Sequence, residues 1–280
     1  LQLRPRLLTL KPGTRVVSVP AAFGPAGSEL VGYSNRFPGG FAERMVLQEA
    51  LLLPVPNGLD AERAALTEPM AVGEHAVAQA PLTPASVALV IGCGPVGLSV
   101  ISALKARGVG PVIATDFSPE RRRAAEALGA DVVLDPREHS PYDRWEDFDV
   151  PATMASFSAS QLMGRSIRDA VVFECVGVPG MIQQLIEKVP PTAAIIVVGV
   201  CMESDTIEPS LAINKQLSLK FVYGYSPEEF AATLGEIADG NRDVTPLMSG
   251  TVGRSQVKDA FASLMGGGGQ IKLLVDPRRA

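Results

Sequence analysis

Three glycines in the segment Gly92-Cys93-Gly94-Pro95-Val96-Gly97 have the spacing of a phosphate-binding turn. The segment follows a β-branched apolar run at 87–91 and opens a stretch with helical periodicity, so we expect a strand, a tight turn and a helix. The first glycine permits the turn, the second lets a phosphate approach the backbone, and the third lets helix and strand pack closely. Free N–H groups at the helix start then face the anion. The simpler alternative is a turn that only links strand to helix.

An acid further along the chain favours the phosphate-binding alternative. Asp116 ends a second apolar run, 112–115, and follows Gly97 by 116 − 97 = 19 residues. A carboxylate at that place can accept hydrogen bonds from both hydroxyls of a nucleotide ribose. It also repels a 2′-phosphate, which favours NAD over NADP, although Arg121 and Arg122 lie nearby in the sequence. The sequence therefore predicts a Rossmann-type unit that holds NAD(H) through the glycine turn and this acid.

The elements that must position these residues alternate between strands and helices from Ser86 onward. Strands are expected at 87–91, 112–115, 132–134, 171–175, 194–198 and 217–222. Helices are expected at 96–107, 119–128, 182–189 and 227–238, and the polar stretch 135–169 is expected to be an elaborated loop with a helix. Six strands make a complete doubly wound parallel sheet, which is an α/β fold.

The two ends of the chain have a different pattern. Residues 1–85 show short extended segments at 14–19 and 41–46 with a turn at 38–40, typical of a small β-rich domain. After Gly224 a helix and two apolar segments suggest a return to that domain. We therefore predict three parts: 1–85 in the β-rich domain, 86–224 in the cofactor domain, and 225–280 as a C-terminal segment that returns to the β-rich domain.

Composition narrows the classes of partner. The 280 residues are 46% hydrophobic and carry a net charge of -5, with lysines and arginines scattered, so nucleic acid is not expected as a partner. The uncharged stretch 86–104 is as long as a membrane span, but two glycines and a proline interrupt it, and we expect no membrane partner. Cys93, Cys175 and Cys201 are too far apart for a disulfide framework or a cysteine-based zinc knuckle, which suits a reducing cytoplasm.

Beyond this unit, the whole chain resembles the medium-chain dehydrogenase/reductase family, in its zinc-type alcohol, threonine and butanediol dehydrogenase branch. Besides the glycine turn, the resemblance is carried by Lys11-Pro12-Gly13-Thr14-Arg15-Val16, Pro38-Gly39-Gly40-Phe41-Ala42-Glu43, Leu66-Thr67-Glu68-Pro69-Met70-Ala71-Val72, Val172-Phe173-Glu174-Cys175-Val176-Gly177 and Ile271-Lys272-Leu273-Leu274-Val275. It implies a Rossmann domain inserted late into a GroES-like β-rich catalytic domain. It also implies a homodimer or homotetramer, joined near 194–201.

The same resemblance implies further cofactor contacts. The nicotinamide pocket would be lined by Val176, Val198, Gly199 and Val200. Arg121 would lie over the adenosine ribose, Lys272 near the pyrophosphate, and Pro95 and Val96 within the phosphate-binding turn. The simpler alternative for the valines is core or strand-end packing, and for Lys272 it is a surface lysine whose stem covers apolar surface.

The resemblance also implies a catalytic zinc, held by a cysteine, a histidine and a third ligand. Glu68 matches the third ligand, whereas the cysteine and the Gly-His-Glu segment belong upstream of Lys11, where this chain has neither. We therefore expect a chain shortened at its N-terminus, and one zinc in the complete enzyme that this chain alone does not bind. His75 has three interpretations: a capping or core histidine, a cofactor contact, or a zinc ligand. His139 is expected to be solvated, and no structural zinc is expected because residues 21–35 contain no cysteine.

The leading function is NAD-dependent hydride transfer between NAD and a secondary alcohol or polyol, assisted by zinc. No catalytic residue is assigned. One alternative is a zinc-free quinone or enoyl reductase, against which Asp116 argues because those branches commonly favour NADP. The other alternative is a non-catalytic NAD(H)-binding remnant. The expected partner is a small-molecule alcohol or carbonyl substrate.

Overall fold

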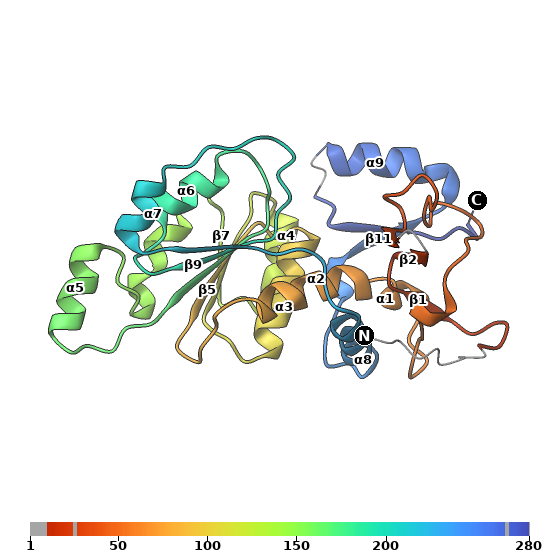
Figure 1. Ribbon diagram of the computed structural model, residues 1–280, viewed down its shortest axis with the longest axis horizontal. Coiled ribbons are helices and arrows are strands. Elements are labelled where there is room, and N and C mark those ends of the chain that lie inside the picture. The colour runs from red at the N-terminus through yellow and green to blue at the C-terminus, as the bar shows by residue number, and fades with distance from the viewer. Residues whose placement is uncertain (1–9, 25–26, 267–268, 280) are drawn as a thin grey trace. The chain divides into compact units, whose positions relative to one another are not determined.

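The structure of the chain is a computed structural model that describes residues 10–24, 27–266 and 269–279 (Figure 1). The chain divides into two compact units. One contains the described residues of Leu1–Glu68, Pro227–Gly268 and Lys272–Ala280. The other contains Pro69–Ser226 and Gly269–Ile271. The predicted phosphate-binding turn and Asp116 both belong to the second, larger unit.

A six-stranded parallel sheet with strand order β10-β9-β8-β5-β6-β7 forms the centre of the larger unit. The strands are β5 (Val87–Ile91), β6 (Val112–Thr115), β7 (Val132–Leu134), β8 (Ala170–Glu174), β9 (Ala194–Val197) and β10 (Ser218–Phe221). This order confirms the doubly wound α/β sheet, and the predicted strand ends differ from the observed ones by no more than one residue. The order reverses at β5, between β6 and β8, which is where such sheets bind ligands.

Helices connect these strands, and α3 and α6 lie on opposite sides of the sheet in Figure 1. Helix α2 (Thr67–Ala78) precedes β5, and the connecting helices are α3 (Pro95–Ala106), α4 (Pro119–Ala127), α5 (Met154–Leu162), α6 (Met181–Lys188) and α7 (Pro209–Lys215). Local chemistry sets several of their starts. Proline occupies the first turn of α3, α4 and α7, where a missing N–H costs no hydrogen bond. The Ser118 side chain caps α4 by accepting the Arg121 N–H.

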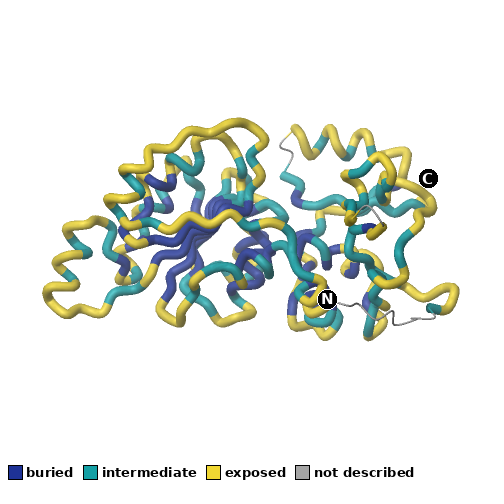
Figure 2. Tube along the Cα trace, in the orientation of Figure 1, coloured by how far each residue is buried: buried dark blue, intermediate teal, exposed yellow. Residues whose placement is uncertain are grey.

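The central strands form much of the core of the larger unit and are dark blue in Figure 2, as are other buried segments such as part of α3. Every residue of β5, β6, β8 and β9 is buried, as expected for parallel strands covered on both faces. The segment 135–169 forms two short 3-10 helices, Pro141–Arg144 and Glu146–Phe148, before α5. Its Trp145 is 1% exposed and belongs to the same hydrophobic cluster as β5 and β8.

The described residues of the smaller unit form three two-stranded sheets. They pair β1 (Val16–Ser18) with β4 (Leu52–Pro54), β2 (Ala21–Gly24) with β3 (Gly27–Leu30), and β11 (Met248–Val252) with β12 (Lys272–Val275). Its helices are α1 (Ala61–Ala64), α8 (Pro227–Ala238) and α9 (Val257–Met265), with 3-10 turns at Glu49–Leu51, Thr245–Leu247 and Arg254–Gln256.

The strand predicted at 41–46 was wrong, because this described segment forms bends and irregular structure. Phe41 packs its ring edge-to-face against Phe261 of α9, with 5.8 Å between ring centroids. Glu43 forms an ion pair with Arg254. Contacts with a distant helix, rather than pairing with a neighbouring strand, therefore hold this segment.

Candidate functional site

The glycine turn follows β5 directly and leads into α3. Gly92 has φ +89°, a conformation that favours glycine, and its N–H donates to the Thr115 carbonyl at 2.9 Å. Gly94 precedes the helix in an extended conformation, and Pro95 is its first residue. A Cβ atom on Gly97 would lie 1.8 Å from the Gly92 carbonyl oxygen, so helix and turn are in backbone contact there.

The space beside Gly94 differs from the space beside Gly97. The nearest atom to a Cβ on Gly94 would be Nη1 of Arg121, at 3.9 Å. A ligand can therefore approach this backbone closely. The partly exposed Val96 lies in the first turn of α3, where backbone N–H groups have no partner within the helix. The turn thus fits a diphosphate: an open backbone face, free amide hydrogens and the positive end of a helix dipole.

Asp116 directly follows β6 and is hydrogen-bonded to the glycine turn. Its Oδ2 accepts the Cys93 backbone N–H at 2.8 Å, and its Oδ1 accepts the Ser118 N–H at 2.8 Å. Nη1 of Arg121 lies 3.8 Å from Oδ2. Each carboxylate oxygen has two lone pairs and could also accept from a ribose hydroxyl. The structure therefore brings together the turn, Asp116 and Arg121.

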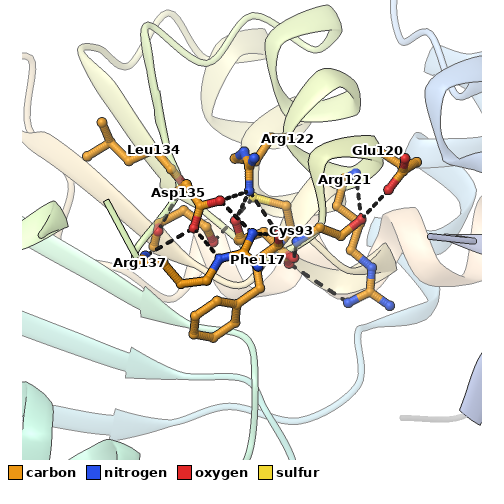
Figure 3. A network of polar contacts seen from close by, with 11 residues as sticks. Cys93, Phe117, Glu120, Arg121, Arg122, Leu134, Asp135 and Arg137 are labelled. Atoms are coloured by element: carbon orange, nitrogen blue, oxygen red, sulfur yellow. Dashed lines mark hydrogen bonds and ion pairs between the residues drawn. The ribbon is translucent and has the colours of Figure 1, made fainter. Parts of the chain in front are cut away.

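A second acid, Asp135, directly follows β7 and so lies at the same end of the parallel sheet as Asp116 (Figure 3). Its Oδ2 lies 2.9 Å from Nη1 of Arg122 and 2.6 Å from Nη2 of Arg137. The side-chain hydrogen bond from Arg137, assisted by the charge of Arg122, holds the pKa of Asp135 well below its usual value although desolvation acts the other way. Arg137 also lies over the ring of Phe117, 5.8 Å from its centroid.

On the other side of the switch point, a buried carboxylate organises the end of β8. Glu174 is 1% exposed, and its Oε1 accepts the N–H groups of Val176 and Gly177 at 2.7 and 2.8 Å. Its backbone carbonyl accepts the N–H groups of Val198 and Gly199, both at 2.9 Å. A Cβ on Gly199 would lie 2.4 Å from the Gly177 nitrogen, so the loops after β8 and β9 are in backbone contact.

A cavity of about 240 Å³ opens beside these loops. Three of the four residues predicted for the nicotinamide pocket line it, namely Val198, Gly199 and Val200. Val200 is 66% exposed and Val198 is buried. Val176 is 41% exposed and is not among the lining residues. The simpler interpretation as buried packing therefore suits Val198 better than the other two valines.

The remaining predicted residues lie elsewhere in the fold. Lys272 opens β12 of the smaller unit, half-buried. Glu68 and His75 both belong to α2 and are half-buried, and His139 is exposed. Over 10–24, 27–266 and 269–279, no group of three or more His, Cys, Asp or Glu side chains could hold a metal ion. The described donor set does not make a zinc site.

Two site residues were missed by sequence reasoning. Asp135 directly follows β7, just as Asp116 directly follows β6. The signal available in the sequence was an acid placed immediately after an apolar run. Glu174 is an acid inside a buried strand, where an ionisable residue needs a structural reason.

Within the described part of the chain, no helix has the length and apolar character needed to cross a lipid bilayer.

Comparison with known proteins agrees with this geometry. Residues 95–239, more than half of the chain, match the family model described as zinc-binding dehydrogenase. The chain belongs to the zinc-binding dehydrogenase family. This membership confirms the resemblance to medium-chain dehydrogenases, a family that uses NAD(H) and zinc.

Individual relatives show how much of such a protein the chain represents. It is 32% identical over 240 residues to (R,R)-butanediol dehydrogenase of Bacillus subtilis, covering 85% of this chain but 64% of that relative. The crystal structure of the 2R,3R-butanediol dehydrogenase from Bacillus subtilis superposes with a TM-score of 0.74 at 30% identity, covering 96% of this chain and 75% of that one. An alcohol dehydrogenase from E. coli CFT073 in complex with NADH shares the fold at 19% identity, with a TM-score of 0.74 and coverage of 94% and 77%.

Proposed function

We propose that this chain binds NAD(H) and belongs to an enzyme that transfers hydride between NAD and a secondary alcohol or polyol. In alcohol oxidation, bound NAD would supply the hydride acceptor: the carbinol carbon would lose a hydride and the hydroxyl proton would pass to solvent, leaving a ketone. The observation that carries the proposal is the link between Asp116 and the glycine turn. The glycine turn offers backbone N–H groups to a diphosphate, and the Asp116 carboxylate beside it offers hydrogen-bond acceptors to a ribose.

The residues assigned to this function remain those of the sequence prediction. Gly92, Gly94, Pro95, Val96 and Gly97 would hold the diphosphate. The adenosine ribose would contact Asp116 and Arg121, the nicotinamide would contact Val176, Val198, Gly199 and Val200, and Lys272 would contact the pyrophosphate. The division at 1–85, 86–224 and 225–280 is likewise a proposal for the domains of the complete enzyme.

The zinc-dependent step is proposed only for the complete enzyme. Glu68 would supply one ligand, and the cysteine and histidine would come from a segment preceding Lys11. Zinc would polarise the substrate oxygen when bound. A chain extended upstream should contain about one zinc per chain and oxidise secondary alcohols or polyols with NAD. Full activity without metal would contradict this part and favour a zinc-free reductase.

The cofactor part is tested on the chain as it stands. Titration with NADH, followed by its fluorescence, should saturate, and NADPH should bind more weakly because Asp116 repels a 2′-phosphate. No saturable binding of either dinucleotide would overturn the proposal. Saturable NADH binding by an upstream-extended chain that turns over no alcohol would instead favour the non-catalytic remnant.

We further propose self-association near 194–201, as the resemblance implies. Because β9 is paired on both sides within its own sheet, the neighbouring edge strand β10 would make the contact. All four residues of this edge strand are exposed, and Phe221 and the neighbouring Tyr223 are 66% and 73% exposed. An edge strand presents unpaired backbone groups that can pair with a second copy. Sedimentation should show a dimer or tetramer, and a monomer at all concentrations would contradict it.

The three free thiols suit a reducing compartment such as the cytoplasm.

A further inference from the structure

Asp135 forms ion pairs with two arginines at once (Figure 3). Arg137 meets it through two bonds, from Nε to Oδ1 at 2.9 Å and from Nη2 to Oδ2 at 2.6 Å. Arg122 meets Oδ2 from the other side at 2.9 Å. The Asp135 side chain is 8% exposed, so water screens these contacts less than it screens surface pairs. One carboxylate therefore engages both guanidinium groups and offsets one of their two positive charges.

Both arginines are fixed against the segment that contains the ribose-binding acid. Nη1 of Arg122 donates to the carbonyls of Asp116 and Phe117 at 2.8 and 2.9 Å. Nη2 of Arg137 donates to the Phe117 carbonyl at 2.8 Å, while its guanidinium lies over the Phe117 ring. Arg137 is nevertheless 59% exposed at its side chain, so it can turn toward solvent or a ligand once its partner is removed.

The other charged groups of this edge also have partners. Arg121 lies 3.8 Å from Asp116, and Arg123 lies 3.1 Å from Glu120. Arginine is well suited to phosphate because its planar fork donates two hydrogen bonds and it is always charged. An unpaired arginine beside Asp116 would thus offset the repulsion of a 2′-phosphate by that carboxylate. Asp135 occupies two arginines of this edge, Arg122 and Arg137, that could do so.

We propose that Asp135 is a specificity-determining residue, which holds Arg122 and Arg137 in ion pairs and so keeps the site beside Asp116 selective for a dinucleotide without a 2′-phosphate. This inference rests on the proposed NAD(H) binding. It gives a second cause, besides Asp116, for the preference of the site for NADH over NADPH. Asp116 repels the phosphate directly, whereas Asp135 withholds the cations that would attract it.

The test compares dissociation constants of NADH and NADPH by fluorescence titration, which requires no turnover. Asp135→Asn keeps an oxygen that can accept from Arg137 but removes the charge. The ratio of the NADPH constant to the NADH constant should fall by about three- to tenfold, the effect of one freed charge at a partly exposed site. Asp131→Asn is the matched control. Asp131 precedes β7, at the end of the strand opposite to Asp135, and forms an ion pair with Lys105. Its variant should leave the ratio unchanged.

Arginine variants separate this explanation from a change in overall charge. Adding Arg137→Gln to Asp135→Asn should reverse most of the shift, because the freed cation is then missing. Arg137→Gln alone should leave the ratio unchanged, because Asp135 already occupies that arginine. This exposed substitution also keeps the proposal testable if Asp135→Asn does not fold.

Three outcomes would overturn the inference while leaving the proposed function intact. They are an unchanged ratio in folded Asp135→Asn, an equal shift in Asp131→Asn, and a weakening of NADPH binding in Arg137→Gln alone, which would show that Arg137 already serves the phosphate. Absence of NADH binding in the unsubstituted chain would instead overturn the proposed function itself.

Discussion

Oδ2 of Asp116 lies 2.8 Å from the Cys93 backbone nitrogen, so the acid after β6 is hydrogen-bonded to the glycine turn after β5. Replacing this acid should therefore affect the cofactor in two ways. Asp116→Ala removes the acceptor for ribose hydroxyls and releases the Cys93 N–H. We expect NADH to bind about tenfold or more weakly and the preference over NADPH to be largely lost, because hydrogen bonds to charged groups contribute about 1.5–3 kcal/mol each. Titration measures both.

Glu120→Gln provides the control for this substitution. Glu120 is an exposed acid in the first turn of α4 that pairs with Arg123. Its variant changes the net charge by the same amount without touching the glycine turn. If Asp116→Ala and Glu120→Gln had equal effects on cofactor preference, the role of Asp116 would reduce to general electrostatics.

Two glycines of one turn should respond oppositely to the same substitution. Gly97→Ala places a methyl group 1.8 Å from the Gly92 carbonyl oxygen, so we expect destabilisation by roughly 2–4 kcal/mol or a failure to fold. Gly94→Ala meets no atom closer than 3.9 Å, so the protein should unfold at nearly the same urea concentration while NADH binds at least about tenfold more weakly. Normal NADH binding by folded Gly94→Ala would show that the cofactor does not approach this backbone.

The buried carboxylate of Glu174 should contribute to stability through the amides it accepts. Glu174→Ala leaves the Val176 and Gly177 N–H groups without their acceptor and should cost about 2–3 kcal/mol in the free energy of unfolding. Glu174→Gln keeps one oxygen for both amides and should cost less. Urea unfolding distinguishes the two, and equal stability of the two variants would show that the hydrogen bonds contribute little.

The cysteine inside the turn should be chemically inert. Burial, assisted by the negative charge of Asp116, raises the pKa of Cys93 to about 12, so at pH 8 only about one thiol in ten thousand is ionised. Alkylation of Cys93 by iodoacetamide should therefore follow unfolding, whereas the half-buried Cys201 should react in the native protein. Peptide mass spectrometry assigns the modified residue. Rapid native modification of Cys93 would contradict the burial that the structure gives it.

Acid should remove the contribution of Asp135 to stability. Its pKa is lowered on folding by Arg137 and Arg122, so its contribution is present above the unfolded-state value of about 4 and is lost as pH falls through the folded-state value. The melting temperature of Asp135→Asn should lie below that of the parent chain at pH 7. The gap should narrow below about pH 4, and a gap of constant size down to pH 3 would contradict the ion pairs.

Sequence reasoning succeeded where local patterns determine structure. The β-branched apolar runs located the strands of the sheet within one residue, because the pattern of a parallel strand buried on both faces depends on nearby residues. The glycine turn and Asp116 were found for the same reason, since strand ends of a parallel sheet meet at one edge.

Other features depended on contacts between distant residues. The strand expected at 41–46 was wrong because Phe41 packs on Phe261 of α9. The roles of Asp135 and Glu174 were missed because their partners are set by side-chain geometry. Arg122 and Arg137 reach Asp135 from a helix and a loop, and no spacing in the sequence indicates that one acid holds both.

The strand order also has a consequence for synthesis of the chain. Strand β5 pairs with β6, whose residues follow closely, but its other neighbour is β8, where Val87 pairs with Ala170. On the ribosome, the half-sheet β5-β6-β7 can form early, while the opposite edge of β5 stays uncovered until Ala170–Glu174 has been made. Nascent chains that end before β8 therefore expose one edge of β5, whose residues are all apolar, and chaperones that bind extended hydrophobic segments have their best opportunity in that interval.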